Sequence, residues 1–490
     1  MKLSIGNRVK SMLQNWLEVV PAVEQTIVLN EQTTFNTDVL RSQIWYRGDS
    51  EELFQFFHQL QVSGVNSSFW GSVPPNEKIR KIHSGLPAII ADTLSFMVCS
   101  DFDGAKISDA KAQNIFDEQT QQFANVLSKA ITDTLVDGDG AFKLSVDSEI
   151  SNKPILEFVG ADRVEYCCTR GILNEVIFRT PIKDKWRTLF FEERYGKGYI
   201  ESALLDAYGI EQEQMLPQLE GIPRRVEFDG DYIMAIPLKF YASKKYPNRG
   251  KSIFDGGKSD CFDALDEVIS QWWDAIRAGR VSKYIPETMI PRDPETGGLK
   301  RVNSFGTEFV TIDSPLSETA DRPRIEIVQP DIKYEAFVNG YSNCLLMCLQ
   351  GLVSPATLGI DIGKMSSADA QREKKDVTGN TRNMITGALE NVLPIVIDAY
   401  FKTLDNMNGR EVKDYDVTVS FGEYGAPDFD TRVETVGKAS TYGIMSVQTQ
   451  VEELWGSSKE DDWKANEVKR IMREKGLTEM NEPAVGDELA

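Results

Sequence analysis

Two helical patterns, at 259–280 and 333–352, enclose a segment of about 50 residues, which is too short to bury a core of its own. The first pattern opens at Ser259, a candidate N-cap, and has acidic residues early and Arg277 and Arg280 late, as the helix dipole favours. Its apolar face is predicted to comprise Phe262, Leu265, Ile269, Trp272, Trp273 and Ile276. The enclosed segment contains the strand-like stretches YIPETMI, EFVTI and RIEIVQ. The sequence therefore predicts an antiparallel helix pair that carries a small β module at its far end.

The rest of the chain alternates between helical and strand-like regions. A polar arm covers 1–40, and helices are expected after Asp49, over 77–98 with a break near Gly85, and over 114–136. Between 141 and 240, short alternating stretches separated by turn residues predict antiparallel strands. Further helix is expected from Ser366 to about Leu404, interrupted near Gly379, Gly387 and Pro394, followed by a strand at YDVTVSFG and two C-terminal helices. These patterns indicate an α+β chain that is predominantly helical.

The overall charge limits the kinds of partner. The 490 residues carry a net charge of −21. Tight binding of nucleic acid depends on Lys and Arg displacing counterions, so this charge argues against a protein that grips DNA. It does not argue against a protein past which DNA slides. No run of 18 or more apolar residues is present, so no membrane span is expected.

Few residues are available for catalysis or metal binding. The only histidines are His58 and His83, and none of the six cysteines forms a CxxC pair. Cys344 and Cys348, four apart on an apolar helix, could suit a metal, or they could be buried free thiols in a reducing compartment. DGDGAF at 137–142 lacks the later ligands of a calcium loop and is interpreted as a turn into a strand. We therefore expect no catalytic residue, no metal and no cofactor.

The stretch GLVSPATLGIDIGKMSS at 351–367 superficially resembles a phosphate-binding loop. Such a loop needs four residues between its glycines and a hydroxyl after the lysine, whereas three residues separate Gly359 from Gly363, and Met365 follows Lys364. The alternative is a loop before a helix that Ser366 and Asp369 cap as a capping box.

The order of these parts, together with several stretches, resembles the portal protein of tailed bacteriophages, the head-to-tail connector of siphophages in particular. The stretches are IWYRGDSEEL from 44, NRGKSIFDG from 248, GLVSPATLGIDIGKMSSADAQREKKDVTGNTRN from 351 and SVQTQVEELWGSSKEDDWKANEVKRIMREKG from 446. The resemblance implies a portal fold with these parts: an N-terminal arm at 1–40, a wing at 41–258, stem helices at 259–280 and 333–352, a small α/β clip at 281–332, a tunnel loop at 353–365, a long kinked helix with a wing strand at 366–430, and a helical crown at 431–490.

The same resemblance implies a function. Portal subunits assemble as a ring of about twelve copies at one capsid vertex, and double-stranded DNA passes non-specifically through the channel during packaging and ejection. The implied partners are the terminase large subunit, the head-tail adaptor, and capsid and scaffolding proteins, with assembly in the bacterial cytoplasm and a final place in the virion.

The resemblance also places three groups of site residues. The channel-facing loop would contain Ser354, Thr357, Gly359, Asp361, Gly363 and Lys364. The stem would present Asp263, Asp266, Glu267, Asp274, Arg277 and Arg280. The clip would dock partners through Tyr284, Glu287, Met289, Arg292, Lys300 and Arg301.

Two other functions remain open at this point. An enzyme would need a nucleophile–base pair or a scaffolded carboxylate pair, and the acids at Asp263, Asp266 and Glu267 are expected to be solvated on a helix face. Another phage structural protein, such as a coat subunit, an adaptor or a tail component, would lack a DNA channel.

Overall fold

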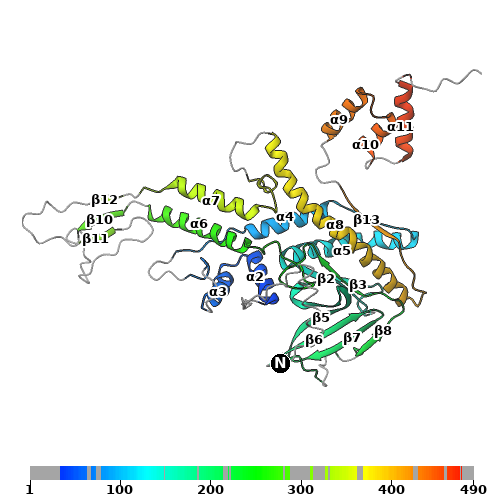
Figure 1. Cartoon of the computed structure of the whole chain (residues 1–490), viewed down its shortest axis with the longest axis horizontal. Helices are drawn as coiled ribbons and strands as arrows, with labels where there is room; N and C mark the ends of the chain where they lie inside the picture. The colour runs from blue at the N-terminus through cyan, green and yellow to red at the C-terminus, as the bar shows by residue number, and fades with distance from the viewer. Residues whose placement is uncertain are drawn as a thin grey trace, which may run out of the picture. The chain divides into compact units, whose positions relative to one another are not determined.

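The computed structural model describes residues 34–62, 68–72, 79–147, 149–184, 187–212, 219, 222–279, 282–286, 309–312, 326–328, 331–360, 368–422, 429–456, 461–474 and 476. The described chain is a mixture of helices and sheets, as expected for an α+β protein (Figure 1). It divides into two compact units. The first comprises Met1–Ser100 with Ala105–Val419, and the second comprises Asp101–Gly104 with Ser420–Ala490.

The described part of the first unit begins with the helices α2 (Phe35–Arg47), α3 (Ser50–Val62), α4 (Leu86–Ser100) and α5 (Ala110–Asp137). The side chain of Thr34 caps α2, so this helix begins inside the segment predicted as a polar arm, and the arm boundary at 40 is wrong. The backbone amides of Glu51 and Glu52 donate to Asp49, which confirms the predicted start of α3. The helix predicted over 77–98 begins only at Leu86, because the amides of Ile82 and Ser84 bond to side chains of a later helix instead of to preceding carbonyls.

The antiparallel strands expected between 141 and 240 form two sheets. One has the order β3 (Ile155–Gly160), β2 (Asp139–Ser145), β9 (Ala235–Lys239), with Phe142 opposite Phe158. The other is a meander of β4 (Val164–Thr169), β5 (Ile172–Asp184), β6 (Arg187–Gly196), β7 (Tyr199–Leu205) and β8 (Arg225–Glu227). Strands β4 and β8 were not predicted. DGDGAF ends α5 and opens β2, which confirms the predicted turn into a strand.

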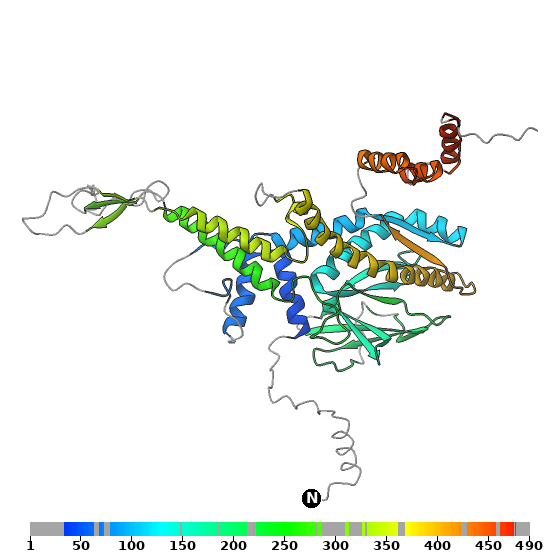
Figure 2. The ribbon, with the colours of Figure 1, turned by 45° about the horizontal axis from the view of Figure 1, so that its top comes forward.

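The predicted helix pair is present as α6 (Lys258–Ala278) and α7 (Tyr334–Leu349), which lie side by side (Figure 2). The two helices run antiparallel. Lys258 Nζ at the start of α6 donates to the carbonyls of Met347 and Gln350 at the end of α7, both at 2.7 Å. Near the opposite ends, a Cβ added at Gly279 would lie 2.7 Å from Ile332 Cδ1. The stretch of sequence between α6 and α7 contains a three-stranded sheet, made up of β11 (Phe309–Ile312), β10 (Ser282–Pro286) and β12 (Glu326–Val328). In this sheet β10 is parallel to β11 and antiparallel to β12.

The long helix α8 (Ala368–Met407) has 40 residues and runs without a break through Gly379, Gly387 and Pro394, so the predicted interruptions are wrong. It packs against α4 and β9 and buries one apolar side, made up of Ile385, Leu389, Leu393, Val396, Ile397 and Phe401. Within it, Val377–Met407 is long and apolar enough to cross a membrane. The core helix of a soluble protein passes the same test, and this helix packs against α4 and β9.

The remaining elements are short. Strand β13 (Val417–Phe421) pairs with β1 (Phe102–Ile107), confirming the strand predicted at YDVTVSFG. The second unit contains α9 (Phe429–Thr441), which was not predicted, α10 (Val447–Trp455) and α11 (Asp461–Glu474). Ser446 caps α10 as expected, through a bond from the Thr449 amide. Trp455 and Trp463 meet edge to face, with ring centroids 5.7 Å apart, and so connect α10 to α11.

Candidate functional site: the helix pair and the turn that follows it

Asp266 of α6 is fully buried, although the sequence placed it on a solvated face of the stem. Its carboxylate accepts from the Trp70 indole at 3.0 Å and from the Ser84 amide at 2.9 Å, and His83 Nδ1 lies 2.7 Å away. None of the Asp266 side-chain surface is exposed, and 6% of that of His83 is. A buried carboxylate is tolerated only with this many partners, so Asp266 serves the interior of the chain.

Asp263, one turn earlier on α6, has a similar role. It accepts from the backbone amides of Phe69 at 2.7 Å and Trp70 at 3.1 Å. Burial raises the pKa of its carboxyl, although the two amide bonds favour the ionised form. The side chain of Ser270, one turn beyond Asp266, accepts from the Ile82 amide at 2.9 Å. This side of α6 therefore supplies acceptors for two chain segments that form no regular secondary structure.

Lys81 holds the same segments together from the other side. Its ammonium donates to the carbonyls of Phe69, Trp70 and Ser72 at 2.5–2.8 Å. Burial lowers the pKa of Lys81 to about 8, while the nearby Asp263 opposes that shift. The Lys81 ammonium is therefore engaged by backbone carbonyls and does not lie on a solvated helix face. We use the term α6 clasp for Asp263, Asp266 and Ser270 of α6 together with residues 68–72 and 79–85.

The other predicted stem residues are more accessible. Glu267 accepts from the side chain of Gln271, Asp274 is half-buried, and Arg277 is exposed. Arg280 lies outside the described residues. Trp273 and Ile276, which were assigned to the apolar face, are 55% and 42% exposed, while Trp272 stacks on Phe337 of α7. Ser259 is not the N-cap of α6, because the helix starts at Lys258 and Gly257 holds the N-cap position. The Ser259 hydroxyl instead accepts from the Trp45 indole at 2.8 Å.

The segment after α7, predicted as the start of a channel-facing loop, is a docked turn. Ser354 is 3% exposed, and its hydroxyl accepts from the Thr357 amide to cap the short helix η4 (Pro355–Leu358). Gly359 ends that helix with φ +68°, a left-handed conformation that suits glycine. The Ser354 side chain is therefore buried against its own chain. Asp361, Gly363, Lys364 and the capping serine Ser366 lie outside the described residues, as does the side chain of Asp369.

Two threonines of α8 hold this turn in place. Thr378 is fully buried, and its hydroxyl accepts from the Ser354 amide at 2.9 Å and shares a hydrogen bond with the Thr357 hydroxyl at 3.0 Å. Thr381 donates to the carbonyl of Leu352 at 2.7 Å. The sequence pattern gave no signal for either threonine, because a hydrogen bond to a segment that is distant in the sequence does not affect the spacing of apolar residues.

The predicted clip residues lie almost entirely outside the described part of the chain. Tyr284 lies in β10, opposite Val310 of β11 and Glu326 of β12, and its side chain is not described. Glu287, Met289, Arg292, Lys300 and Arg301 lie outside the described residues. Their proposed role in docking stays a prediction.

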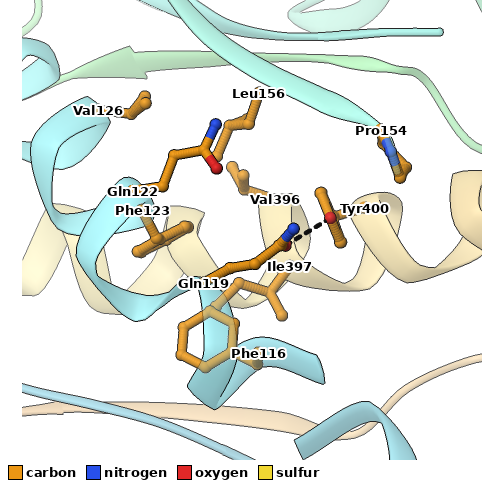
Figure 3. A pocket seen from close by; sticks show the side chains of 10 residues that line it. All are labelled: Phe116, Gln119, Gln122, Phe123, Val126, Pro154, Leu156, Val396, Ile397 and Tyr400. Atoms are coloured by element: carbon orange, nitrogen blue, oxygen red, sulfur yellow. Dashed lines mark hydrogen bonds between the residues drawn. The ribbon is translucent and has the colours of Figure 1, made fainter. Parts of the chain in front are cut away.

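A small apolar cavity of about 40 Å³ lies between α5 and α8 (Figure 3). The Tyr400 hydroxyl donates to Gln119 Oε1 at 2.6 Å at its edge, and burial raises the pKa of Tyr400 to about 12. The other lining residues are Phe116, Gln122, Phe123, Val126, Pro154, Leu156, Val396 and Ile397. A neutral phenol and two amides among apolar walls offer no nucleophile and no base near neutral pH.

A larger polar cavity, of about 670 Å³, borders α2, α5, β3 and β5. Asp137 lies at its wall, and burial raises the pKa of this carboxyl to about 8, with the charge of Asp133 adding to the shift. Its Oδ2 atom accepts from the Gln43 side chain at 3.2 Å. Asp139, the first residue of β2, pairs with Arg249 at 2.9 Å and accepts from the Gly250 amide. The first contact joins α2 to the end of α5, and the other two join the start of β2 to the 243–252 loop.

The described residues contain no group of three His, Cys, Asp or Glu side chains arranged to hold a metal ion. Burial raises the pKa of the Cys348 thiol to about 12 and also raises that of Cys344, which disfavours the thiolate that a metal requires. His58 stacks on Phe54, and its Nδ1 atom lies 3.4 Å from the carbonyl of Gly71.

Comparison with known proteins adds a distant structural similarity. No protein-family model and no curated protein sequence matches the chain. Among solved structures, a chain from the neck of a native GTA particle, computed with C12 symmetry, aligns with a TM-score of 0.36 and 11% sequence identity. The alignment covers 81% of this chain and 93% of that one.

Proposed function

We propose that the chain is the subunit of a phage portal, a ring of about twelve copies at one capsid vertex through which double-stranded DNA enters and leaves the head. The observation that carries the proposal is the antiparallel pair α6–α7 with a separate three-stranded sheet between the two helices in the sequence. In a ring, such a pair from each copy would form the channel wall, and the sheet would be the docking surface for the terminase and, later, the head-tail adaptor.

The charge of the chain suits a conduit. A net charge of −21 per subunit disfavours adhesion of a duplex that itself carries a negative charge every ~1.7 Å. The duplex could then move in both directions without being held. The subunit itself would hydrolyse nothing, and the terminase would supply the work of packaging.

Electron microscopy of the purified full-length protein tests this proposal. A closed ring with a central hole, with α6 and α7 along its axis, is the expected result. Closed shells would instead favour a coat protein, and stacked tubes or monomers would favour a tail component or an adaptor. An ATPase assay on the same preparation separates the structural proposal from an enzymatic one, because ATP turnover by the purified ring would contradict it.

A further inference from the structure

The turn after α7 is fixed to its surroundings at three points, although its sequence is rich in small and flexible residues. The first point is at the end of α7, where Lys258 Nζ of α6 donates to the carbonyls of Met347 and Gln350, each at 2.7 Å. These carbonyls belong to the last turn of a helix, where no intrahelical amide is available to them. Lys258 is half-buried, and burial lowers the pKa of its ammonium group. One side chain thus connects the start of α6 to the end of α7.

The second and third points are on α8. The buried amide of Ser354 has the Thr378 hydroxyl as its acceptor, and the Leu352 carbonyl accepts from Thr381. Leu352 and Val353 between these polar contacts are 8% and 1% exposed, so apolar packing fixes the same stretch. The hydroxyls of Ser354, Thr357 and Thr378 form a chain, in which Thr357 Oγ1 lies 3.0 Å from Ser354 Oγ and 3.0 Å from Thr378 Oγ1. Two backbone bonds, from Gly359 to Ala356 and from Ile360 to Pro355, then complete the turn.

We propose that Thr378, Thr381 and Lys258 are positioning residues that set where the channel loop leaves the wall. This inference rests on the proposed portal function and refines it. The loop would leave the wall at Ile360, one short helix later than the sequence placed it, and residues 352–360 would belong to the rigid wall. The three anchors come from α6 and α8, so the position of the loop is determined jointly by the helix pair and by the long helix.

Thr378→Val tests the inference because it keeps the shape of the side chain and removes the acceptor of the Ser354 amide. Hydrogen exchange of the purified protein should show the amides of 352–360 exchanging at least about tenfold faster, with α6 unchanged, since a buried amide without a partner favours opening. Thr386→Val is the matched control, because Thr386 is a buried threonine of the same helix whose hydroxyl donates only to the nearby carbonyl of Asn383. Thr378→Ser, which keeps the hydroxyl, should restore slow exchange.

A second experiment tests function. It measures the filled fraction, which is the number of DNA-filled heads in producing cells divided by the number of all heads that contain the ring. Thr378→Val should lower the filled fraction several-fold without lowering ring incorporation, and Thr378→Ser and Thr386→Val should fill normally. If Thr378→Val prevents folding, Lys258→Met, which removes the bonds at the other anchor, takes its place in both arms. Unchanged exchange over 352–360, or normal filling despite faster exchange, would overturn the inference. If the wild-type protein forms no perforated ring, the portal proposal fails, while the exchange arm still decides whether the turn is anchored.

Discussion

His83 Nδ1 lies 2.7 Å from a carboxylate oxygen of Asp266, and neither side chain has appreciable contact with solvent. The other ring nitrogen of His83 is buried without a hydrogen-bond partner. The ring also packs on Gly48, at the end of α2, where an added Cβ would lie 2.7 Å from the His83 ring. The α6 clasp therefore also connects α6 to the end of α2 through His83, in addition to the hydrogen bond from the Trp45 indole to Ser259.

Removing the carboxylate from the α6 clasp should be costly. In Asp266→Ala the Trp70 indole, the Ser84 amide and His83 lose their common partner inside the protein, and we expect the free energy of unfolding to fall by about 3–5 kcal/mol. Urea denaturation at fixed protein concentration measures this. Asp274→Ala, on the same helix but half-exposed, should change stability by less than about 0.5 kcal/mol. An equal decrease in the free energy of unfolding of the two variants would contradict a stabilising role for the Asp266 carboxylate.

The pH dependence of stability should report on Asp137. Its pKa rises from 3.8 to about 8 on folding, so between these values the folded chain binds a proton that the unfolded chain has lost. The free energy of unfolding contributed by this group is thus complete at low pH and falls as pH rises towards 8, by at most about 1.4 kcal/mol per pH unit. Asp137→Asn stays neutral, so its stability should fall less than that of the wild type between pH 5 and 8.

Chemical denaturation at several pH values provides the measurement. Asp117→Asn, an exposed position on the same helix, is the control and should reproduce the wild-type profile. Parallel profiles for the wild type and Asp137→Asn would contradict a buried, protonated Asp137.

Two glycines should respond in opposite ways to alanine. Gly387 lies inside α8 with no other atom within 4 Å of an added Cβ, so Gly387→Ala should stabilise the protein by about 0.5–1 kcal/mol. A Cβ at Gly250 would clash with the carbonyl of Gly138, and backbone cannot move aside cheaply, so Gly250→Ala should destabilise it by several kcal/mol. Thermal unfolding of both variants checks the pair of signs, and a destabilised Gly387→Ala would mean that α8 is interrupted there after all.

Lys364 is the one positively charged residue in the predicted channel-facing loop, 353–365. Because a ring of lysines at the loop would attract the duplex weakly, Lys364→Glu should lower the yield of DNA-filled heads several-fold, while Lys364→Arg should not. Ring assembly, followed by electron microscopy, should be normal in both. A normal yield of filled heads from Lys364→Glu would remove this residue from the proposal.

Periodic patterns in the sequence predicted the regular elements well. Helices α5, α6, α7 and α10 and most strands between 141 and 240 lie where apolar spacing and capping residues placed them. The prediction of a helix over 77–98 was wrong in its first half for a specific reason. Its first half has helix-like spacing of Ile79 and Ile82, but Asp266 and Ser270, almost 200 positions later, provide its amides with better acceptors. Tertiary hydrogen bonds of this kind cannot be read from local spacing.

The same limit affected the site residues. Acids on an amphipathic helix are usually solvated, so Asp263 and Asp266 looked like surface charges, yet they accept hydrogen bonds from residues 68–72 and 79–85, and Asp266 is fully buried. Glycines 379 and 387 suggested breaks in the long helix, but packing against α4 and β9 outweighs a helix penalty of about 1 kcal/mol for each glycine. Ser354 looked like part of a flexible loop, because nothing in the local sequence reveals Thr378 as its partner.

The close approach of Gly279 to Ile332 has a consequence for how such chains could diversify. The peptide leaves α6 and returns to α7 at neighbouring points, so the intervening stretch is an insertion with adjacent ends. Its length and composition can therefore change during evolution without disturbing the helices that border it. Related proteins could therefore differ in the segment between α6 and α7, to suit a new partner, and keep the rest of the subunit unchanged.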